Sequence, residues 1–301
     1  MKKVVYIALG LLLLIVVLNF PKIKLGYRYY VSPCFYDTPV KQNDFPQVFL
    51  TLNLEDYYKE IKHLATPYFK IDTLETITYK NKSYPILGLT KKGVRSLDKK
   101  LLVIAGVHGN ESAGTLAILE FLKEYNLNPK RFDGWNMNII TPLNPVGTAE
   151  MSRYNECGCD LNRKVNSSKQ KGIVVQRKVV DSFKPDIILS MHEAPSEGFL
   201  IHSNDYLKDE LLRKLLNETA EKGIQLATKD YLEQELTIPG NSKIKGGLKL
   251  LNKILQVQAL GDYVSDKGIM EITTESGWNS EDSFQRVNSH VFLLLSLVDN
   301  Y

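Results

Sequence analysis

The sequence predicts one α/β domain built on a mixed, mostly parallel sheet with helices on both faces. Short apolar runs alternate along the chain with segments whose apolar residues recur at helical spacing, and this alternation is typical of such a sheet. Apart from an apolar stretch at its N-terminus, the chain offers about 275 residues, enough for one domain with a substantial core. Apolar residues make up 44% of the chain and charged residues 24%, so a disordered chain is not expected.

The N-terminus begins Met-Lys-Lys and continues with an apolar run from residue 4 to residue 18. The run is shorter than the ~17–25 residues of a membrane span and has a normal length for the apolar part of a secretory signal. No small residues that would favour cleavage follow it. We therefore expect residues 1–24 to form an uncleaved signal anchor that enters the membrane through residues 4–20; a cleaved signal peptide and a buried core helix are the alternatives. The two lysines favour a cytoplasmic N-terminus, with residues 25–301 forming a domain outside the membrane.

The elements are predicted in chain order from apolar spacing and turn-forming residues. A turn at Asn81 and Lys82 separates the first two strands, and the wholly apolar run before Gly106 is typical of a buried parallel strand. Helices are assigned where apolar residues recur every three or four positions, and strands where short apolar runs are bounded by turn signals. The predicted order is helix 50–64, strands 76–79, 84–89 and 101–105, helix 111–124, strand 137–143, helix 173–183, strand 187–190, helices 206–222 and 248–258, strand 269–274 and helix 280–297.

Three of these strands are followed directly by histidine or glutamate. His108 and Glu111 follow the strand at 101–105, and His192 and Glu275 each follow a later strand. Ligands of α/β sheets bind at the carboxyl ends of the strands, so these side chains are expected to converge. Two imidazoles and a carboxylate suit Zn²⁺, which keeps a fourth position for water in a catalytic site. Alone, the HxxE spacing is a weak signal, because a histidine after a strand is more often an ordinary hydrogen-bonded residue.

A polar, Gly/Pro-rich stretch lies between the two histidine segments. It contains the sequences NPVG, SRYN and DLNR, and so brings Arg153, Asn162 and Arg163 into one region. Such a stretch can be an ordinary surface loop. It can also be a clamp for a carboxylate, because the planar guanidinium of arginine binds carboxylates through two parallel hydrogen bonds.

Together, the motifs GVHGNES, NPVG, SRYN, DLNR, SMHE and ITTES resemble, in this order, the pattern of the zinc carboxypeptidase family. The resemblance covers residues 51–297 and implies the fold of that family for the domain at 25–301. It also implies that Zn²⁺ is the cofactor and that His108, Glu111 and His192 hold it. The reaction that it implies is hydrolysis of an amide bond next to a free carboxylate.

The same resemblance gives roles to four further residues. Asn162 and Arg163 would grip the terminal carboxylate of the substrate, and Arg153 would polarise the scissile carbonyl. Glu275 would take a proton from the zinc-bound water as general base and return it to the leaving amine. Glu271 is the alternative base, because strand alternation puts both glutamates on the same face. The position of Glu275 at the end of its strand favours Glu275.

Two departures from the family pattern bear on the substrate. The tyrosine that closes over the substrate in carboxypeptidases has no clear equivalent, and the two histidine segments are close in the sequence. The compact spacing favours the smaller branches of the superfamily, which are the cell-wall (murein) peptide amidases and carboxypeptidases and the aspartoacylase- or desuccinylase-like deacylases of N-acyl amino acids. An external, membrane-anchored domain fits cell-wall peptides better. A zinc-free pseudoenzyme that binds peptide carboxylates is the hypothesis from a different class.

The charge and the cysteine content bear on nucleic-acid binding and on disulfide bonds. The net charge of +4 is small, and no basic helix with interleaved aromatic residues occurs, so nucleic-acid binding is not expected. Three cysteines cannot all be paired within one chain. A bridge between Cys157 and Cys159, with one residue between them, would be strained, so we expect structural thiols.

Overall fold

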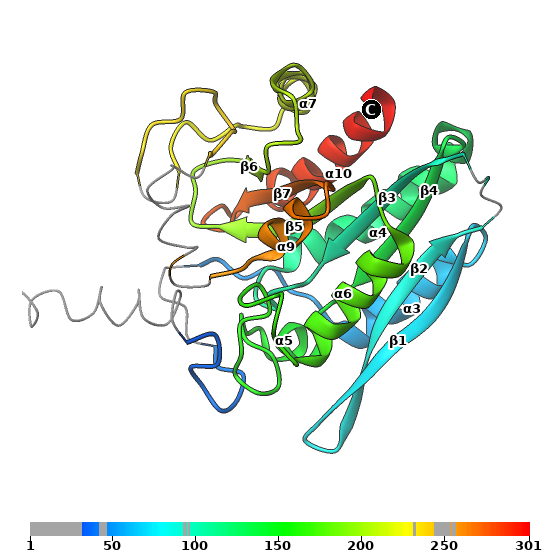
Figure 1. Cartoon of the computed structure of the whole chain (residues 1–301), viewed down its shortest axis with the longest axis vertical. Coiled ribbons are helices and arrows are strands. Elements are labelled where there is room, and N and C mark those ends of the chain that lie inside the picture. Colours follow the sequence, from blue (N-terminus) through cyan, green and yellow to red (C-terminus); the bar gives the residue numbers. More distant parts are fainter. Residues whose placement is uncertain are drawn as a thin grey trace, which may run out of the picture.

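The computed structural model describes residues 32–41, 47–92, 95, 97–230, 233–243, 254 and 257–301. A seven-stranded sheet has the order β1-β2-β4-β3-β5-β7-β6 (Figure 1). The strands are β1 (Phe69–Tyr79), β2 (Lys82–Lys91), β3 (Lys99–Ala105), β4 (Trp135–Thr141), β5 (Ile187–Ala194), β6 (Leu200–Ser203) and β7 (Met270–Gly277). The helices are α3 (Leu54–Ala65), α4 (Ser112–Leu127), the short 3-10 helix η1 (Pro129–Phe132), α5 (Pro145–Glu150), α6 (Lys171–Phe183), α7 (Asp209–Glu221), α9 (Leu260–Ser265) and α10 (Ser283–Asn300).

The four central strands, β4, β3, β5 and β7, run parallel to one another. The β1–β2 hairpin pairs antiparallel with β4 at one side of this group, and the short β6 pairs antiparallel with β7 at the other. The predicted mixed α/β sheet is therefore confirmed, with its antiparallel strands at the edges. The carboxyl ends of the central strands point to the left of Figure 1, which is the edge where the sequence predicts the site.

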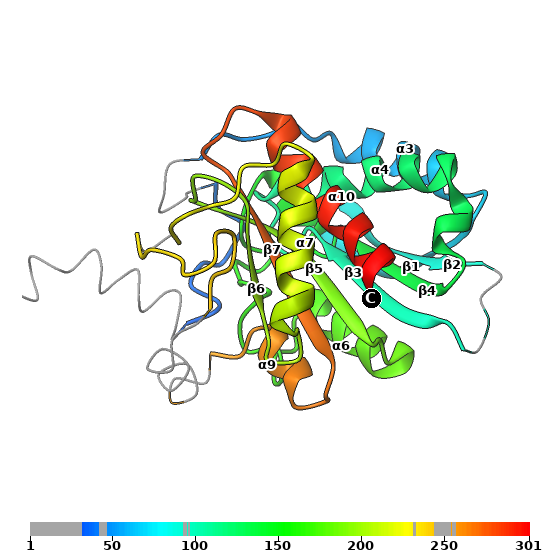
Figure 2. The same cartoon turned by 90° about the horizontal axis from the view of Figure 1, so that it is seen from above.

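Helices cover both faces of the sheet (Figure 2). Helices α3, α4, α7 and α10 pack on one face, where side chains such as Phe121 and Leu294 are fully buried. Helices α5, α6 and α9 cover the other face, around Ile173 and Leu260. Apolar burial on both sides explains why residues 101–105 of β3 and 187–189 of β5 are continuously apolar rather than alternating.

Most predicted elements are present, and the differences concern the neighbourhood of the site. β5 continues to Ala194 and β7 to Gly277, because the two strands stay buried and paired beyond the point where their sequences turn polar. His192 and Glu275 therefore lie within strands and not after them. The sequence patterns did not predict β6, α5 or α9, since elements of four and six residues are too short to produce a periodic signal.

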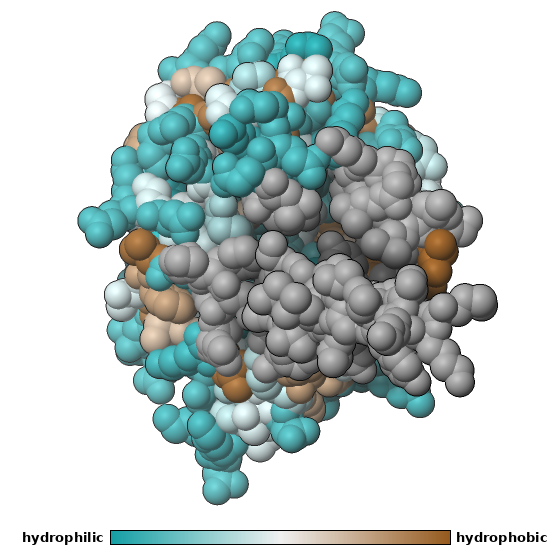
Figure 3. Space-filling view, turned by 90° about the vertical axis from the view of Figure 1, so that its left-hand side faces the viewer, coloured by the Kyte–Doolittle hydropathy of each residue, from teal (hydrophilic) through white to brown (hydrophobic). Residues whose placement is uncertain are grey.

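The expected signal anchor at residues 1–24, and nearly all of the expected helix at 248–258, lie outside the described residues. Within the described part of the chain, no helix is both long and apolar enough to span a membrane. The face of the molecule at the carboxyl ends of the central strands is shown in Figure 3. Apart from the grey residues, it is mostly hydrophilic, with hydrophobic residues in small, separate patches.

Residues 32–41 lie against the loop that carries the predicted substrate-binding residues. A disulfide joins Cys34 to Cys159, and the backbone N–H of Asp160 donates to the carbonyl of Pro33 at 2.7 Å. The expectation of unpaired structural thiols was therefore wrong for this pair. The two cysteines are 125 residues apart, and no local pattern links positions at that distance.

A glycine allows the two segments to approach. Gly158 has a φ of +70°, and a Cβ atom on it would lie 2.1 Å from the backbone carbonyl oxygen of Tyr36. Any other residue would be both strained and in collision at this position. Of the cysteines in the described residues, Cys157 alone is free, and it is exposed.

We predict that Cys34→Ser lowers the free energy of unfolding by roughly 2–5 kcal/mol, because the disulfide closes a long loop of the unfolded chain. Denaturant unfolding with and without reductant measures the effect. Reductant should destabilise the wild type and leave Cys34→Ser unchanged, while Cys157→Ser should behave like the wild type. A Cys34→Ser protein as stable as the oxidised wild type would show that the bridge does not stabilise the fold.

Candidate metal centre

Three buried side chains converge at the carboxyl edge of the sheet. His108 and Glu111 come from the turn between β3 and α4, and His192 comes from β5. The Nδ1 atoms of His108 and His192 each lie 2.8 Å from a different oxygen of the Glu111 carboxylate, and they lie 3.2 Å from each other. One ligand atom from each of the three residues lies within 4.8 Å of the others. The structure thus brings together the three residues predicted as metal ligands.

The other nitrogen of each imidazole already has a partner. Nε2 of His108 lies 3.1 Å from the Asp160 carboxylate, and Nε2 of His192 lies 3.1 Å from the hydroxyl of Ser190. An ionised carboxylate only accepts hydrogen bonds, so a metal held through Nδ1 of His108 would leave Nε2–H as the donor to Asp160. Two imidazole nitrogens and a carboxylate that face one point, with each ring oriented by a second partner, are a donor set that can hold a metal ion such as Zn²⁺.

The turn that carries His108 and Glu111 is packed against the segment that begins α5. The backbone N–H of Asn144 donates to the carbonyl of Gly106 at 2.8 Å. A Cβ atom on Gly109 would lie 1.8 Å from the backbone carbon of Gly147, so a glycine is required at this contact. Gly109 therefore serves the approach of the NPVG segment, whereas Gly106 has a φ of +69° and a Cβ atom on it would lie 2.7 Å from the Cβ atom of Pro142.

Arg153 stands between the metal cluster and Asp160. Its Nη1 donates to Glu111 at 3.2 Å, and its Nε donates to Asp160 at 3.0 Å. Burial alone would raise the pKa of Asp160, but the charges of Arg153 and Arg163, together with the contact with His108, outweigh burial and hold that pKa well below its usual range. Burial likewise acts to raise the pKa of Glu111, but the adjacent His108 and His192 hold it low. Both carboxylates are therefore ionised. This suits Glu111 as a predicted metal ligand and Asp160 as the hydrogen-bond acceptor for the His108 ring.

Glu275 lies next to the cluster because of strand register. It pairs with His192 across β5 and β7, so the two side chains project from the same face of the sheet. One of its carboxylate oxygens is buried and has no hydrogen-bond partner among the described residues. Burial, reinforced by the negative charge of Glu111, raises the pKa of Glu275 well above its ordinary value. A carboxyl group with a raised pKa binds a proton more readily than an ordinary glutamate, as a proton-transferring group requires.

Glu271, the alternative base, lies further along β7 from the predicted metal ligands. It lies four residues earlier on β7, pairs with Ile188 of β5 in the parallel register, and accepts a hydrogen bond from Thr273. Burial raises its pKa to about 7. The register thus favours Glu275 over Glu271 as the group beside the metal ligands.

Asn162 and Arg163 follow Asp160 on the disulfide-bonded loop. The side-chain oxygen of Asn162 accepts the backbone N–H of Leu260 at 3.1 Å, at the start of α9, so its amide N–H groups remain as donors. Nη1 of Arg163 donates to the carbonyl of Asn162 at 2.8 Å. Since Asp160 bonds to His108, the loop lies beside the metal cluster. The binding of a substrate carboxylate by Asn162 and Arg163 stays a prediction.

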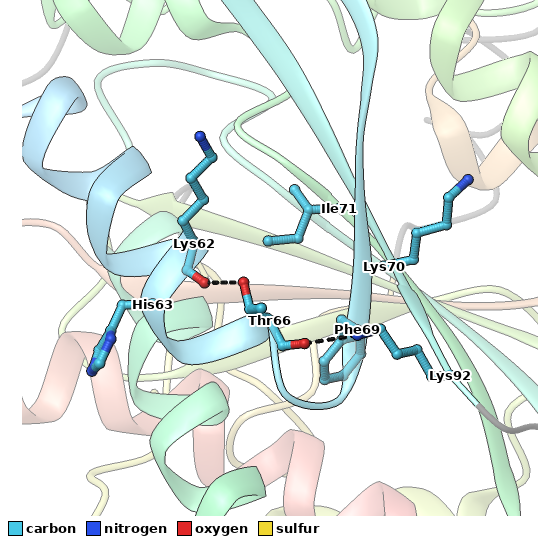
Figure 4. A pocket seen from close by; sticks show the side chains of 7 residues that line it. All are labelled: Lys62, His63, Thr66, Phe69, Lys70, Ile71 and Lys92. Carbon is cyan, nitrogen blue, oxygen red and sulfur yellow. Dashed lines mark hydrogen bonds between the residues drawn. The ribbon is translucent and has the colours of Figure 1, made fainter.

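A surface hollow, drawn in Figure 4, is separate from this cluster. It lies where α3 ends and β1 begins, and Nζ of Lys92 donates there to the carbonyl of Thr66 at 2.8 Å. No residue of the metal cluster lines it. The lining residues are Lys62, His63, Thr66, Phe69, Lys70, Ile71 and Lys92.

Solved structures share this arrangement of strands and helices. A proposed metallopeptidase from Shewanella denitrificans matches with a TM-score of 0.67 and 18% identity, over 86% of this chain and 97% of that one. A metallo-carboxypeptidase from Burkholderia cenocepacia matches with a TM-score of 0.61 and 13% identity, over 83% and 69%. Bovine thrombin-activatable fibrinolysis inhibitor, in complex with tick carboxypeptidase inhibitor, matches with a TM-score of 0.60 and 13% identity, over 83% and 96%. The chain has a zinc carboxypeptidase-like fold.

Part of the chain also matches a known family by sequence. The family model for the succinylglutamate desuccinylase/aspartoacylase catalytic domain matches residues 98–196. This range begins just before β3 and ends just after β5, so it includes the three predicted metal ligands. No curated protein matches the chain by sequence. The resemblance to the zinc carboxypeptidase-like superfamily is confirmed.

Within this carboxypeptidase-like fold, sequence reasoning left two supporting groups without a role. Asp160 is part of the DLNR motif, which could have directed attention to it, but its contact with His108 crosses 52 residues. Arg286 of α10 gives no signal in the sequence at all. Its Nε donates at 2.8 Å to Glu193, whose other oxygen accepts the backbone N–H of Ala113 at the start of α4 at 2.9 Å. Glu193 thus joins β5 to two helices.

We predict that Glu271→Gln stabilises the protein above neutral pH. The pKa of Glu271 is raised from 4.5 to about 7 by burial, so the folded state holds a proton that the unfolded chain loses. The corresponding stability is present below pH 4.5 and lost as the pH rises through about 7, an effect of up to about 3 kcal/mol. Glutamine keeps the acceptor for Thr273 and has no charge to bury.

Denaturant unfolding at pH 4 and pH 8 measures this effect. The variant should exceed the wild type at pH 8 and equal it at pH 4. Glu210→Gln, at an exposed position of α7, should match the wild type at both pH values. A stability difference that is the same at both pH values would contradict the assignment.

Proposed function

We propose that the chain is a zinc-dependent hydrolase that cleaves an amide bond next to a free carboxylate. The observation that carries the proposal is the convergence of two oriented imidazole nitrogens and a carboxylate, with Glu275 in register beside them. His108, Glu111 and His192 would hold the metal. The fold supports the proposal, since metallo-carboxypeptidases share it.

The residues divide the reaction between them. Bound Zn²⁺ would supply a Lewis acid and lower the pKa of a coordinated water to about 7. Glu275 accepts a proton from the water that attacks the carbonyl carbon and returns it to the leaving amine. Its raised pKa suits this role. The guanidinium of Arg153 faces the cluster and stabilises the negative charge that develops on the carbonyl oxygen. Asn162 and Arg163 bind the carboxylate of the substrate.

A peptide with a free C-terminus is the first candidate substrate, and cell-wall peptides are the proposed source. The disulfide between Cys34 and Cys159 supports a domain that works in an oxidising compartment, because disulfides are rare in reducing ones. Together with the anchor proposed for residues 1–24, this favours a location outside the membrane.

An N-acyl amino acid is the second candidate, and the family match favours it specifically. The matched model describes desuccinylases and aspartoacylases. These substrates also present an amide bond next to a free carboxylate, so the same residues would serve. Parallel assays of the zinc-loaded protein on peptides and on N-acyl amino acids separate the two. A zinc-bound protein that hydrolyses neither would favour a pseudoenzyme that only binds carboxylates.

The metal assignment predicts opposite outcomes for two substitutions. His192→Ala should abolish turnover and sharply lower bound zinc, because it removes one of three ligands. Glu275→Gln should keep stoichiometric zinc and lose about 10²–10⁴-fold in kcat, because it removes only proton transfer. Atomic absorption on both folded variants decides, and stoichiometric zinc in His192→Ala would refute the ligand set.

If Arg163 binds the substrate carboxylate, removal of either group should cause the same loss of kcat/KM, and the two losses should not add. Arg163→Ala should lower kcat/KM by about 100-fold or more for a substrate with a free carboxylate, because charged hydrogen bonds contribute about 1.5–3 kcal/mol each. Amidation of that carboxylate should lower wild-type kcat/KM by a similar factor. The measurement is the four-way comparison of both proteins on both substrates. Additive losses would show that Arg163 does not bind the carboxylate.

A further inference from the structure

One buried histidine contacts the residues on both sides of Glu275. His290 lies on α10, on the face of the sheet opposite the metal cluster, and it is fully buried. Its Nδ1 lies 2.8 Å from the hydroxyl of Thr274, and its Nε2 lies 3.1 Å from the hydroxyl of Ser276. Strand alternation explains the arrangement: the neighbours of Glu275 point toward α10, while Glu275 points toward the metal ligands.

The directions of these hydrogen bonds follow from the contacts of Thr274. Its hydroxyl donates to the backbone carbonyl of Ser190 at 3.3 Å, so it accepts from Nδ1–H of His290. Nε2 then carries a lone pair and accepts the hydroxyl proton of Ser276. Burial lowers the pKa of His290 to about 3, so the ring is neutral and this single arrangement holds throughout the neutral range.

The same chain of bonds reaches the metal ligand. Ser190, which accepts from Thr274 through its carbonyl, also contacts Nε2 of His192 through its hydroxyl at 3.1 Å. His290 is therefore connected through one side chain, that of Thr274, to the strand that carries His192, and directly to the strand that carries Glu275. One turn earlier on the same helix, Arg286 holds Glu193, the residue after His192. Helix α10 is thus hydrogen-bonded to the carboxyl-terminal ends of both β5 and β7.

We propose that His290 is a positioning residue that fixes Glu275 relative to His192 through Thr274 and Ser190. The proposal rests on the proposed function, since it concerns residues that support the same site from behind the sheet. His290 touches neither the metal ligands nor the space where a substrate would lie. Its effect is on the placement of the general base, and a displacement of a catalytic group by about 1 Å lowers turnover about 100-fold.

The test compares His290→Phe with Leu294→Ala in the zinc-loaded protein. His290→Phe removes both hydrogen bonds and keeps an aromatic ring of similar size. Leu294 is fully buried one turn further along α10, so Leu294→Ala destabilises the same helix without touching the hydroxyls of β7. We expect His290→Phe to lower kcat about 10–100-fold with KM within about twofold and zinc retained, and Leu294→Ala to lower the melting temperature with kcat kept.

Two further variants keep the test decisive if His290→Phe does not fold. His290→Asn places an amide donor at the position of Nδ1 and should restore most of kcat. Thr274→Val removes the link to Ser190 and should lower kcat in the same way, and its loss should not add to that of His290→Phe.

The outcomes separate this proposal from the function on which it rests. An active wild type with a kcat in His290→Phe no lower than in Leu294→Ala would overturn the positioning role alone. Additive losses for Thr274→Val and His290→Phe would also overturn it. A zinc-bound wild type that hydrolyses neither peptides nor N-acyl amino acids would overturn the proposed function and the positioning role together.

Discussion

The parallel register between β5 and β7 is the constraint on which the site depends. It sets His192 opposite Glu275 on one face of the sheet. Alternation along the same strands then sends Glu193, Thr274 and Ser276 to the other face, where α10 meets them. A shift of one residue between the strands would separate Glu275 from His192 and disrupt the hydrogen bonds that Arg286 and His290 of α10 make with the two strands. The packing of the core and the geometry of the site are therefore fixed by the same pairing.

The cluster also shows how several charges share a buried volume. Glu111 and Asp160 are ionised because His108, His192 and Arg153 surround them. Arg153 also acts on Glu275, but burial and the negative charge of Glu111 outweigh it and raise the pKa of Glu275. Carboxyl groups within one site therefore differ in pKa because of their neighbours, and the proposed roles of metal ligand and general base require such a difference. Removal of one charged partner would leave the others in an apolar setting, where an unpaired charge is strongly destabilising.

The sequence predicted the fold class and the residues that converge on the metal site, because both depend on local patterns. Apolar runs located the central strands, and the polar residues that come after them in the sequence marked the carboxyl edge. The sequence favoured Glu275 over Glu271 by its place at the end of the strand, and the strand register, which no spacing reveals, puts Glu275 opposite His192. Asp160, Arg286 and His290 act through contacts that join distant segments. The pairing of Cys34 with Cys159 has the same origin, because the fold brings together residues that have no local relation.

The disulfide has a consequence for the order of events during synthesis. A chain grows from its N-terminus at about 5–20 residues per second, so the 125 residues that follow Cys34 take about 6–25 s to appear before Cys159 does. Cys157 emerges two residues earlier, exposed in the finished fold and available as the first possible partner. The native pair is therefore selected by the geometry of the folded loop, where Gly158 separates the two thiols and turns Cys159 toward Cys34. An oxidant that acts before this loop has folded would trap the wrong bridge.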